Sequence, residues 1–109
     1  MIWGLPWDNR ETANALKLFI AQNQPDEWHL NTFIPFPGTP YWERPDTYGI
    51  EIVDRDFKHY YHLGRHARGA IVARNAYCSK DELEVLRDEI FAYILNLIPD
   101  KRVLYGMEV

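Results

Sequence analysis

Two loops rich in glycine and proline, each directly after a short apolar segment, constrain the fold of this chain more than any other feature. The first loop begins Gly4-Leu5-Pro6, and the second occupies residues 34–40 with the sequence Ile-Pro-Phe-Pro-Gly-Thr-Pro. The segments before them, residues 1–5 and 27–33, read as strands. About 20 residues with a helical pattern separate the strands, as in a right-handed βαβ crossover. We therefore predict an α/β fold with both loops at the carboxyl edge of a parallel sheet, where ligands bind.

Capping residues mark the first two expected helices. Asp8 is a suitable N-cap for the helix between the strands, Glu11 completes a capping box, and Pro25 ends the helix. Thr39 is expected to cap a short helix that has Pro40 at its first position. The apolar face of the first helix is expected to consist of Leu16, Phe19, Ile20 and Asn23.

The last third of the chain contains the clearest helix. Ser79 is its expected N-cap, Glu82 completes a capping box, and Pro99 ends the helix near Ile98. Its apolar stripe at helical spacing consists of Leu83, Leu86, Ile90, Ile94 and Leu97. This pattern predicts a helix packed along one face.

The middle of the chain and its end are less regular. Residues 50–53 are expected to form a brief strand after a loop that ends at Gly49. Residues 54–75 are expected to be irregular, with one helical turn near 57–61 and an extended stretch at 70–73. Residues 103–109 are expected to form a strand or an ordered tail.

Composition excludes several classes of function. The 109 residues suffice for one small domain, and 47% hydrophobic and 26% charged residues are typical of folded proteins. The net charge of −4 argues against general nucleic-acid binding. No apolar run approaches the roughly 20 residues of a membrane span, and the first residues lack a signal-peptide pattern. Because Cys78 is the single cysteine, no intrachain disulfide can form, and a cytoplasmic location is expected.

Positive charge gathers between residues 55 and 74, which contain five of the twelve Lys and Arg side chains and one acid. Such a patch on an acidic protein indicates an anionic ligand, a partner surface or a solvated face. We name Arg65, Arg68 and Arg74 as candidates for holding a substrate phosphate or carboxylate.

Three of the four histidines lie in the same segment: His59, His62 and His66. With Asp54 and Asp56 nearby they suggest a metal site, but such a site needs three or four converging ligands, and Gly64 interrupts any helix between them. We therefore predict surface or partner-facing histidines and no metal site. Cys78 stands before a helix N-terminus, yet no base accompanies it, so no catalytic residue is predicted.

Together, the two loops resemble those in the last third of a radical S-adenosylmethionine (radical SAM) enzyme. In that family the fifth strand commonly ends in Gly-hydrophobic-Pro-Gly-Glu-Thr, and residues 4–9 stand in that place with Trp7 and Asp8 as departures. The sixth strand is often followed by Pro-aromatic-Pro-Gly-Thr-Pro, which residues 35–40 match throughout. The later order of an Asp-rich aromatic turn (54–57) and a Ser-x-x-Glu-Leu helix (79–83) resembles the cobalamin-binding and related subgroups.

The resemblance implies a fold and a set of ligand contacts. Residues 1–49 would form the last two βα units of a partial (βα)6 TIM-like barrel, residues 50–78 an irregular basic and aromatic connection, and residues 79–109 a C-terminal helix and tail. All three parts would form one compact unit. By position in the family, the residues beside the adenine of S-adenosylmethionine are Ile2, Gly4, Phe33, Ile34 and Pro35.

The resemblance also implies a parent enzyme. That parent holds a [4Fe–4S] cluster on Cys-x3-Cys-x2-Cys, cleaves S-adenosylmethionine to a 5′-deoxyadenosyl radical, and abstracts hydrogen from a small-molecule substrate; cobalamin is an optional further cofactor. A chain with one cysteine cannot hold that cluster. We therefore expect a C-terminal fragment that is catalytically silent alone. Its expected partner is the missing N-terminal half of the barrel, or a second copy through exposed apolar faces.

Two alternatives to the fragment are considered. The first is a free-standing small α/β binding or interaction module without catalysis, which should be a cooperatively folding monomer. The second is an enzyme that uses the His/Asp segment to hold a metal of its own.

Overall fold

Two short strands at the start of the chain pair in parallel, as the loop pattern predicted. The computed structural model describes residues 1–23, 30–60 and 70–97. In it β1 (Ile2–Trp3) pairs with β2 (Asn31–Thr32), and α1 (Arg10–Asn23) lies between them in the sequence. The Asn31 N–H donates to the Met1 carbonyl at 2.8 Å, and the Phe33 N–H donates to the Trp3 carbonyl at 2.8 Å. The carboxyl ends of both strands therefore lie at the same edge.

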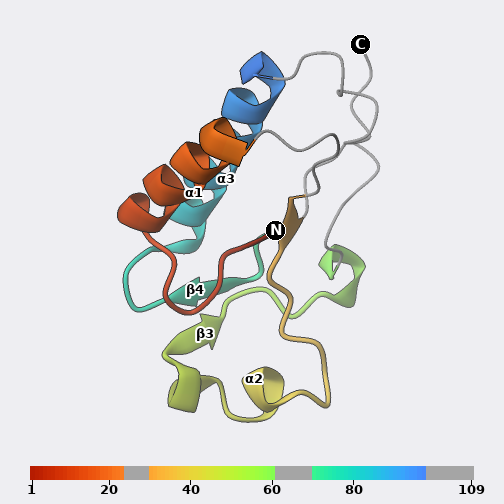
Figure 1. The fold of residues 1–109 in the computed structure, drawn as a ribbon. Coiled ribbons are helices and arrows are strands. Elements are labelled where there is room, and N and C mark those ends of the chain that lie inside the picture. Colours follow the sequence, from red (N-terminus) through yellow and green to blue (C-terminus); the bar gives the residue numbers. More distant parts are fainter. Residues whose placement is uncertain (24–29, 61–69, 98–109) are drawn as a thin grey trace.

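The described chain is mixed α/β and divides into a helical end and an end built of short elements (Figure 1). The helical end consists of α1 and α3 (Lys80–Leu97), side by side. The other end consists of α2 (Pro40–Glu43), η1 (Pro45–Tyr48), β3 (Ile50–Ile52), η2 (Phe57–His59) and β4 (Ala73–Asn75). No helix within the described ranges is long and apolar enough to cross a membrane.

A second, antiparallel strand pair joins the strand expected at residues 50–53 to a strand in the segment expected to be irregular. β3 pairs with β4, with Ile50 opposite Asn75 and Ile52 opposite Ala73. The strand expected at residues 50–53 is confirmed, and so is the helical turn that begins at Phe57. The extended stretch expected at residues 70–73 meets β4 only at its last residue, since β4 begins at Ala73.

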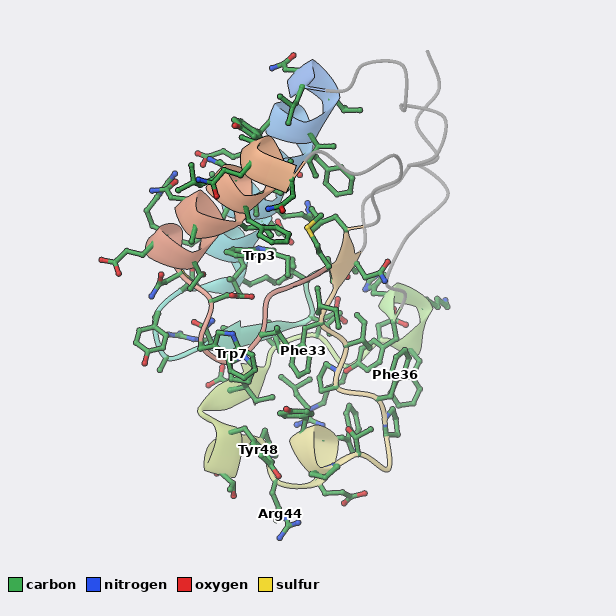
Figure 2. The ribbon with its side chains drawn as sticks, in the orientation of Figure 1. Trp3, Trp7, Phe33, Phe36, Arg44 and Tyr48 are labelled. Carbon is green, nitrogen blue, oxygen red and sulfur yellow. The ribbon has the colours of Figure 1, made fainter. Side chains whose placement is uncertain are left out.

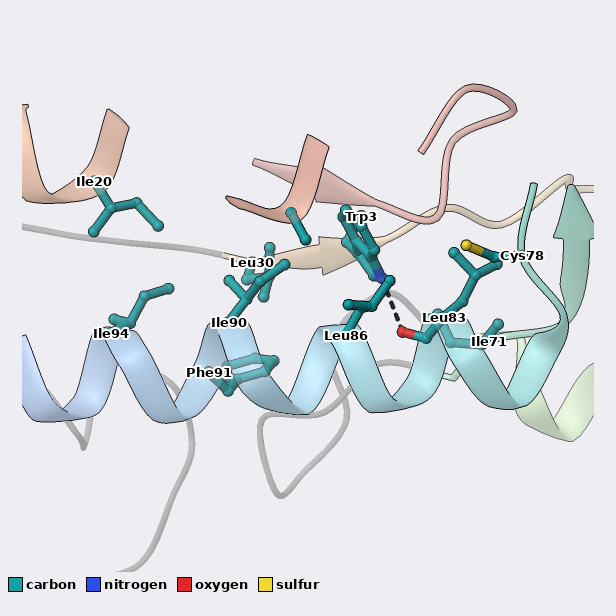
Figure 3. Close-up of a cluster of buried hydrophobic side chains, with 11 residues drawn as sticks. Trp3, Ile20, Leu30, Ile71, Cys78, Leu83, Leu86, Ile90, Phe91 and Ile94 are labelled. Atoms are coloured by element: carbon teal, nitrogen blue, oxygen red, sulfur yellow. Dashed lines mark hydrogen bonds between the residues drawn. The ribbon is translucent and has the colours of Figure 1, made fainter. Parts of the chain in front are cut away.

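Side chains from distant parts of the chain form the core between the two helices. Trp3 points into the helical layer, whereas Phe33 lies toward α2 (Figure 2). The indole Nε1 of Trp3 donates to the Leu83 carbonyl at 2.9 Å (Figure 3). The stripe expected on α3 is confirmed, with Leu97 only partly buried, and Phe91 joins it. The core cluster consists of Trp3, Ala13, Ile20, Leu30, Ile71, Cys78, Leu83, Leu86, Ile90, Phe91 and Ile94.

The apolar face expected on α1 was wrong in part. Ala13 and Ile20 are buried and Leu16 packs against the core, but Phe19 is 54% exposed. Ala13 and Ile20 are seven residues apart and share a face, which α3 covers. Phe19 is one residue from Ile20, about 100° around the helix, and therefore points away.

The N-cap predicted for α1 was also wrong by one residue. The helix begins at Arg10, and the Asn9 Oδ1 accepts from the Thr12 N–H at 3.0 Å. The Thr12 Oγ1 in turn accepts from the Asn9 N–H at 2.8 Å, so Asn9 and Thr12 form the capping pair. The Asp8 side chain turns back toward β1 instead, because two backbone N–H groups lie there.

The other two caps are confirmed. The Ser79 Oγ accepts from the Glu82 N–H at 3.2 Å, and the Glu82 carboxylate accepts from the Ser79 N–H at 3.5 Å. The Thr39 Oγ1 accepts from the Trp42 N–H at 3.4 Å, with Pro40 as the first residue of α2. The helix end near Ile98 and the strand or tail expected at residues 103–109 lie outside the described residues.

Candidate functional site

The two loops meet where β1 and β2 end. Gly4 has φ +97°, which disfavours any residue with a Cβ, and it faces Phe33. A Cβ built on Gly4 would lie 3.8 Å from the Phe33 Cβ and 3.7 Å from the Ile71 Cδ1. A Cβ there would make ordinary van der Waals contacts, so the backbone angle, and not a lack of space, favours glycine where the first loop meets the second.

The five residues predicted to contact adenine come together at this edge but differ in exposure. Ile2 is 51% exposed and Phe33 is half-buried. Gly4, Ile34 and Pro35 are buried. The side chains of Ile34 and Pro35 are therefore covered within the chain, and the open apolar surface of the group is formed by Ile2 and part of Phe33.

A buried carboxylate shapes the first loop. The Asp8 Oδ2 accepts from the Gly4 N–H and the Leu5 N–H, both at 2.9 Å. Burial raises the pKa of Asp8 above its usual range, and the hydrogen bonds from Leu5, Gly4 and Thr12 oppose that rise. The role of Asp8 is thus to close the turn after β1.

A buried amide ties this loop to the entry of α3. The Asn75 Nδ2 donates to the Leu5 carbonyl at 3.0 Å and to the Asp8 carbonyl at 2.8 Å. The Asn75 Oδ1 accepts from the Tyr77 N–H at 2.9 Å and the Cys78 N–H at 2.7 Å. All four hydrogen-bonding positions of this amide are therefore used. Asn75 was not predicted as a site residue, because nothing near it in the sequence marks a long-range contact.

Local bonds fix the second loop. Gly38 has φ +90° with open space around it, which agrees with the turn role expected for a glycine there. The Thr39 Oγ1 donates to the Phe36 carbonyl at 2.7 Å, and the Thr39 N–H donates to the same carbonyl at 3.1 Å. The loop thus leads directly into α2.

Aromatic side chains border the second loop, and their clustering was not predicted from the sequence. Phe33 meets Tyr41 edge-on with ring centroids 5.0 Å apart, and Tyr41 meets Tyr48 at 4.6 Å. A second group contains Phe36, Trp42, Phe57 and Tyr60, with centroids 5.2 to 6.3 Å apart. The Arg55 guanidinium lies 4.8 Å from the centroid of the Trp42 ring, a cation–π contact. The one signal in the sequence is its 15% aromatic content.

A histidine and an aspartate pair beside these rings. The His59 Nδ1 lies 2.7 Å from the Asp54 Oδ2, and the Tyr60 hydroxyl donates to the Asp54 carbonyl at 2.8 Å. The Asp56 N–H, and then His59, lower the pKa of Asp54, while burial raises the pKa of Tyr60. In the part of the chain that the structure describes, no group of three His, Cys, Asp or Glu side chains could hold a metal ion.

The arginine and cysteine candidates named from the sequence belong to neither of the two loops. Arg74 is exposed on β4, opposite Glu51 of β3. Arg65 and Arg68, like His62 and His66, lie outside the described residues. Cys78 is buried, and burial followed by the charge of Glu82 raises the pKa of its thiol, so the protonated form dominates at neutral pH.

The described residues place the two loops together at the carboxyl edge of a parallel strand pair, with an aromatic border. Such an edge is the usual binding position in α/β folds. Comparison of the chain with protein-family models, curated proteins and solved structures returns no match.

Proposed function

We propose that this chain is the C-terminal part of a radical SAM iron–sulfur enzyme of the cobalamin-binding or a related subgroup. It would complete the last two units of a partial (βα)6 barrel and form part of the wall around S-adenosylmethionine. The observation that carries this proposal is the meeting of Gly4 and Phe33 at the ends of two parallel strands. The match of residues 35–40 to the family's loop supports it.

The contacts with adenine are assigned by exposure. Ile2 and Phe33 would offer apolar side-chain surface, since they are the accessible members of the group. Gly4, Ile34 and Pro35 are buried, so they would contribute backbone groups and hold the wall in place. Asp8 and Asn75 would keep the first loop in its binding shape through the bonds described above.

The iron–sulfur cluster of this class does not fit the residues present. The cluster needs three thiolates at close spacing, whereas Cys78 is the single cysteine and is buried. No step on the cluster is therefore assigned to these residues. The cluster, and cobalamin where it is used, would be bound by the rest of the parent enzyme, and this chain alone would be catalytically silent.

The missing half of the barrel is the expected partner. Apolar side chains that a complete barrel would cover are exposed here: Ile2 on β1, and Leu18 and Phe19 on α1. β1 also has β2 as its one strand neighbour among the described residues, so a further strand can pair with its other edge. Without that half, association between copies through the same side chains is expected.

The coding DNA upstream of Met1 tests the proposal. An in-frame upstream segment of about 150 residues or more that carries Cys-x3-Cys-x2-Cys after a strand would support it, since that length is one further domain. A stop codon and a ribosome-binding site directly before Met1 would contradict it.

A free-standing binding module is the second candidate, and the core favours it. Leu83, Ile90 and Ile94 are fully buried within this one chain, so these side chains of the helical end need no partner chain to cover them. Sedimentation velocity and denaturant unfolding distinguish the two. A monomer with one cooperative transition favours the module, whereas concentration-dependent association favours the fragment.

A further inference from the structure

A cavity at the start of α3 shares no residue with the loops at the strand ends. Its volume is about 250 Å³, and it is lined by Arg10, Cys78, Asp81, Glu82, Val85 and Leu86. An apolar cavity of roughly 150 Å³ already accepts benzene. The space is therefore sufficient for one ring, or a branched alkyl group, that carries a short substituent.

The walls of this cavity are largely apolar. Leu86 is buried in the core, while Val85 is 54% exposed at the mouth. The Cys78 thiol is buried and makes no hydrogen bond with another described residue, and its raised pKa keeps it uncharged at neutral pH. A cavity lined by an uncharged thiol and two aliphatic side chains suits an apolar group.

The charged side chains that line the cavity are one arginine and two carboxylates, Arg10, Asp81 and Glu82. The Arg10 guanidinium is occupied by Glu89, with Nη1 and Oε2 2.6 Å apart. The Glu82 carboxylate faces Ser79 in the cap, at 3.2 Å from its hydroxyl. The Asp81 carboxylate makes no hydrogen bond or ion pair with another described residue. A ligand that places a positive charge beside Asp81 would gain a partner that no described residue supplies.

We propose that this cavity is a binding site for a small organic amine. Its apolar group lies against Cys78, Val85 and Leu86, and its protonated nitrogen lies beside Asp81. The proposal does not depend on the radical SAM assignment, because it uses a different surface of the chain. The space limits the ligand to fragment size, so a dissociation constant of about 1 mM is expected for a simple amine.

The test compares two probes of equal shape on the full chain. 2-Phenylethylamine and 2-phenylethanol are titrated while the methyl NMR signals of Val85 and Leu86 are followed. We expect the amine to shift these signals saturably and to bind roughly two- to fivefold more tightly than the alcohol, the range of an exposed ion pair. Equal affinity of the two probes, or no saturation by about 10 mM, overturns the proposal.

Two variants and a control locate the interaction. Asp81→Asn should reduce the affinity for the amine to that for the alcohol and leave the alcohol unchanged. Val85→Trp should abolish binding of both probes, and it is a mild change because Val85 is exposed. Asp46→Asn removes a carboxylate on η1 as the control and should change neither affinity. An amine affinity that survives both Asp81→Asn and Val85→Trp in folded protein places the probe elsewhere and rejects the site.

Discussion

The helical end and the end that holds the second loop are stabilised in different ways. α3 alone contributes five buried side chains to the core, whereas α2, η1 and η2 contain no buried residue. In the second end the β3–β4 pair buries Ile50, Ile52 and Ala73, while caps and edge-on contacts between rings stabilise its short helices. Regions with few buried apolar contacts open at a smaller free-energy cost than the core. The short helices α2, η1 and η2 are therefore expected to open more easily than the helical end.

The largest expected effect tests this difference directly. Ile90→Ala removes a fully buried side chain between α1 and α3 and should lower the free energy of unfolding by about 2 to 5 kcal/mol. Phe57→Ala removes a larger side chain that is 60% exposed on η2 and should cost about 1 kcal/mol. Urea unfolding measures both, with Val85→Ala on the exposed face of α3 as the control. A larger loss for Phe57→Ala would reverse the comparison.

Asn75 connects the two ends, and its replacement should have the next largest effect. Asn75→Asp can still accept from Tyr77 and Cys78 but cannot donate to the Leu5 and Asp8 carbonyls. It also brings a second carboxylate toward Asp8. We expect a loss of roughly 2 to 3 kcal/mol in urea unfolding at neutral pH. A loss that stays the same after acidification to about pH 3, where carboxyl groups protonate, would argue against the charge contribution.

Two glycines with similar positive φ angles allow the cost of the same backbone strain to be compared at two places in the fold. Gly4→Ala places a Cβ at φ +97° with room for it, so strain alone should cost about 1 to 2 kcal/mol. Gly38→Ala adds the same atom at φ +90° in open space. Because its loop can rearrange without moving the core, we expect a smaller loss of global stability for Gly38→Ala. Equal losses would show that both loops are held with equal rigidity.

The smallest effect concerns pH. Burial raises the folded-state pKa of Asp8, so the folded chain binds more protons than the unfolded chain at pH values above the ordinary pKa of 3.8. The contribution of Asp8 to stability therefore falls as pH rises through that window. Asp8→Asn keeps an oxygen acceptor for Gly4 and Leu5 without the charge. Its stability relative to the unaltered chain should increase between about pH 4 and neutral pH, as unfolding midpoints measure. A decrease over this range would contradict the assigned direction.

Local patterns predicted much of the fold. The Ser79–Glu82 cap, the Thr39–Pro40 helix start and the stripe on α3 are confirmed, since each depends on neighbours within about one helical turn. The parallel pairing of β1 and β2 is also confirmed, because the length between the strands favoured a crossover. The prediction of Asp8 as the N-cap of α1 was wrong, because the Asp8 carboxylate accepts from the N–H groups of Gly4 and Leu5 instead.

The candidate site was predicted less completely. Ile2, Gly4 and Phe33 were named from their positions in the family that the two loops resemble, and they do lie near the strand ends. Their exposure was not predictable, because it depends on which distant elements cover them. For the same reason, three contacts were not predicted: Ile71 with Gly4, the Asn75 amide with the first loop, and Tyr41 with Phe33.

By itself, the sequence determined where α2 and α3 begin, which α3 residues face inward and which two loops follow strands. Those properties depend on backbone torsion preferences and on side-chain period, which act over a few residues. Only the tertiary structure decided that Phe19 is exposed, that β3 pairs with β4 and that one amide joins the first loop to α3. Each of these depends on contact between segments far apart in the sequence, where burial and long-range hydrogen bonds outweigh local preference.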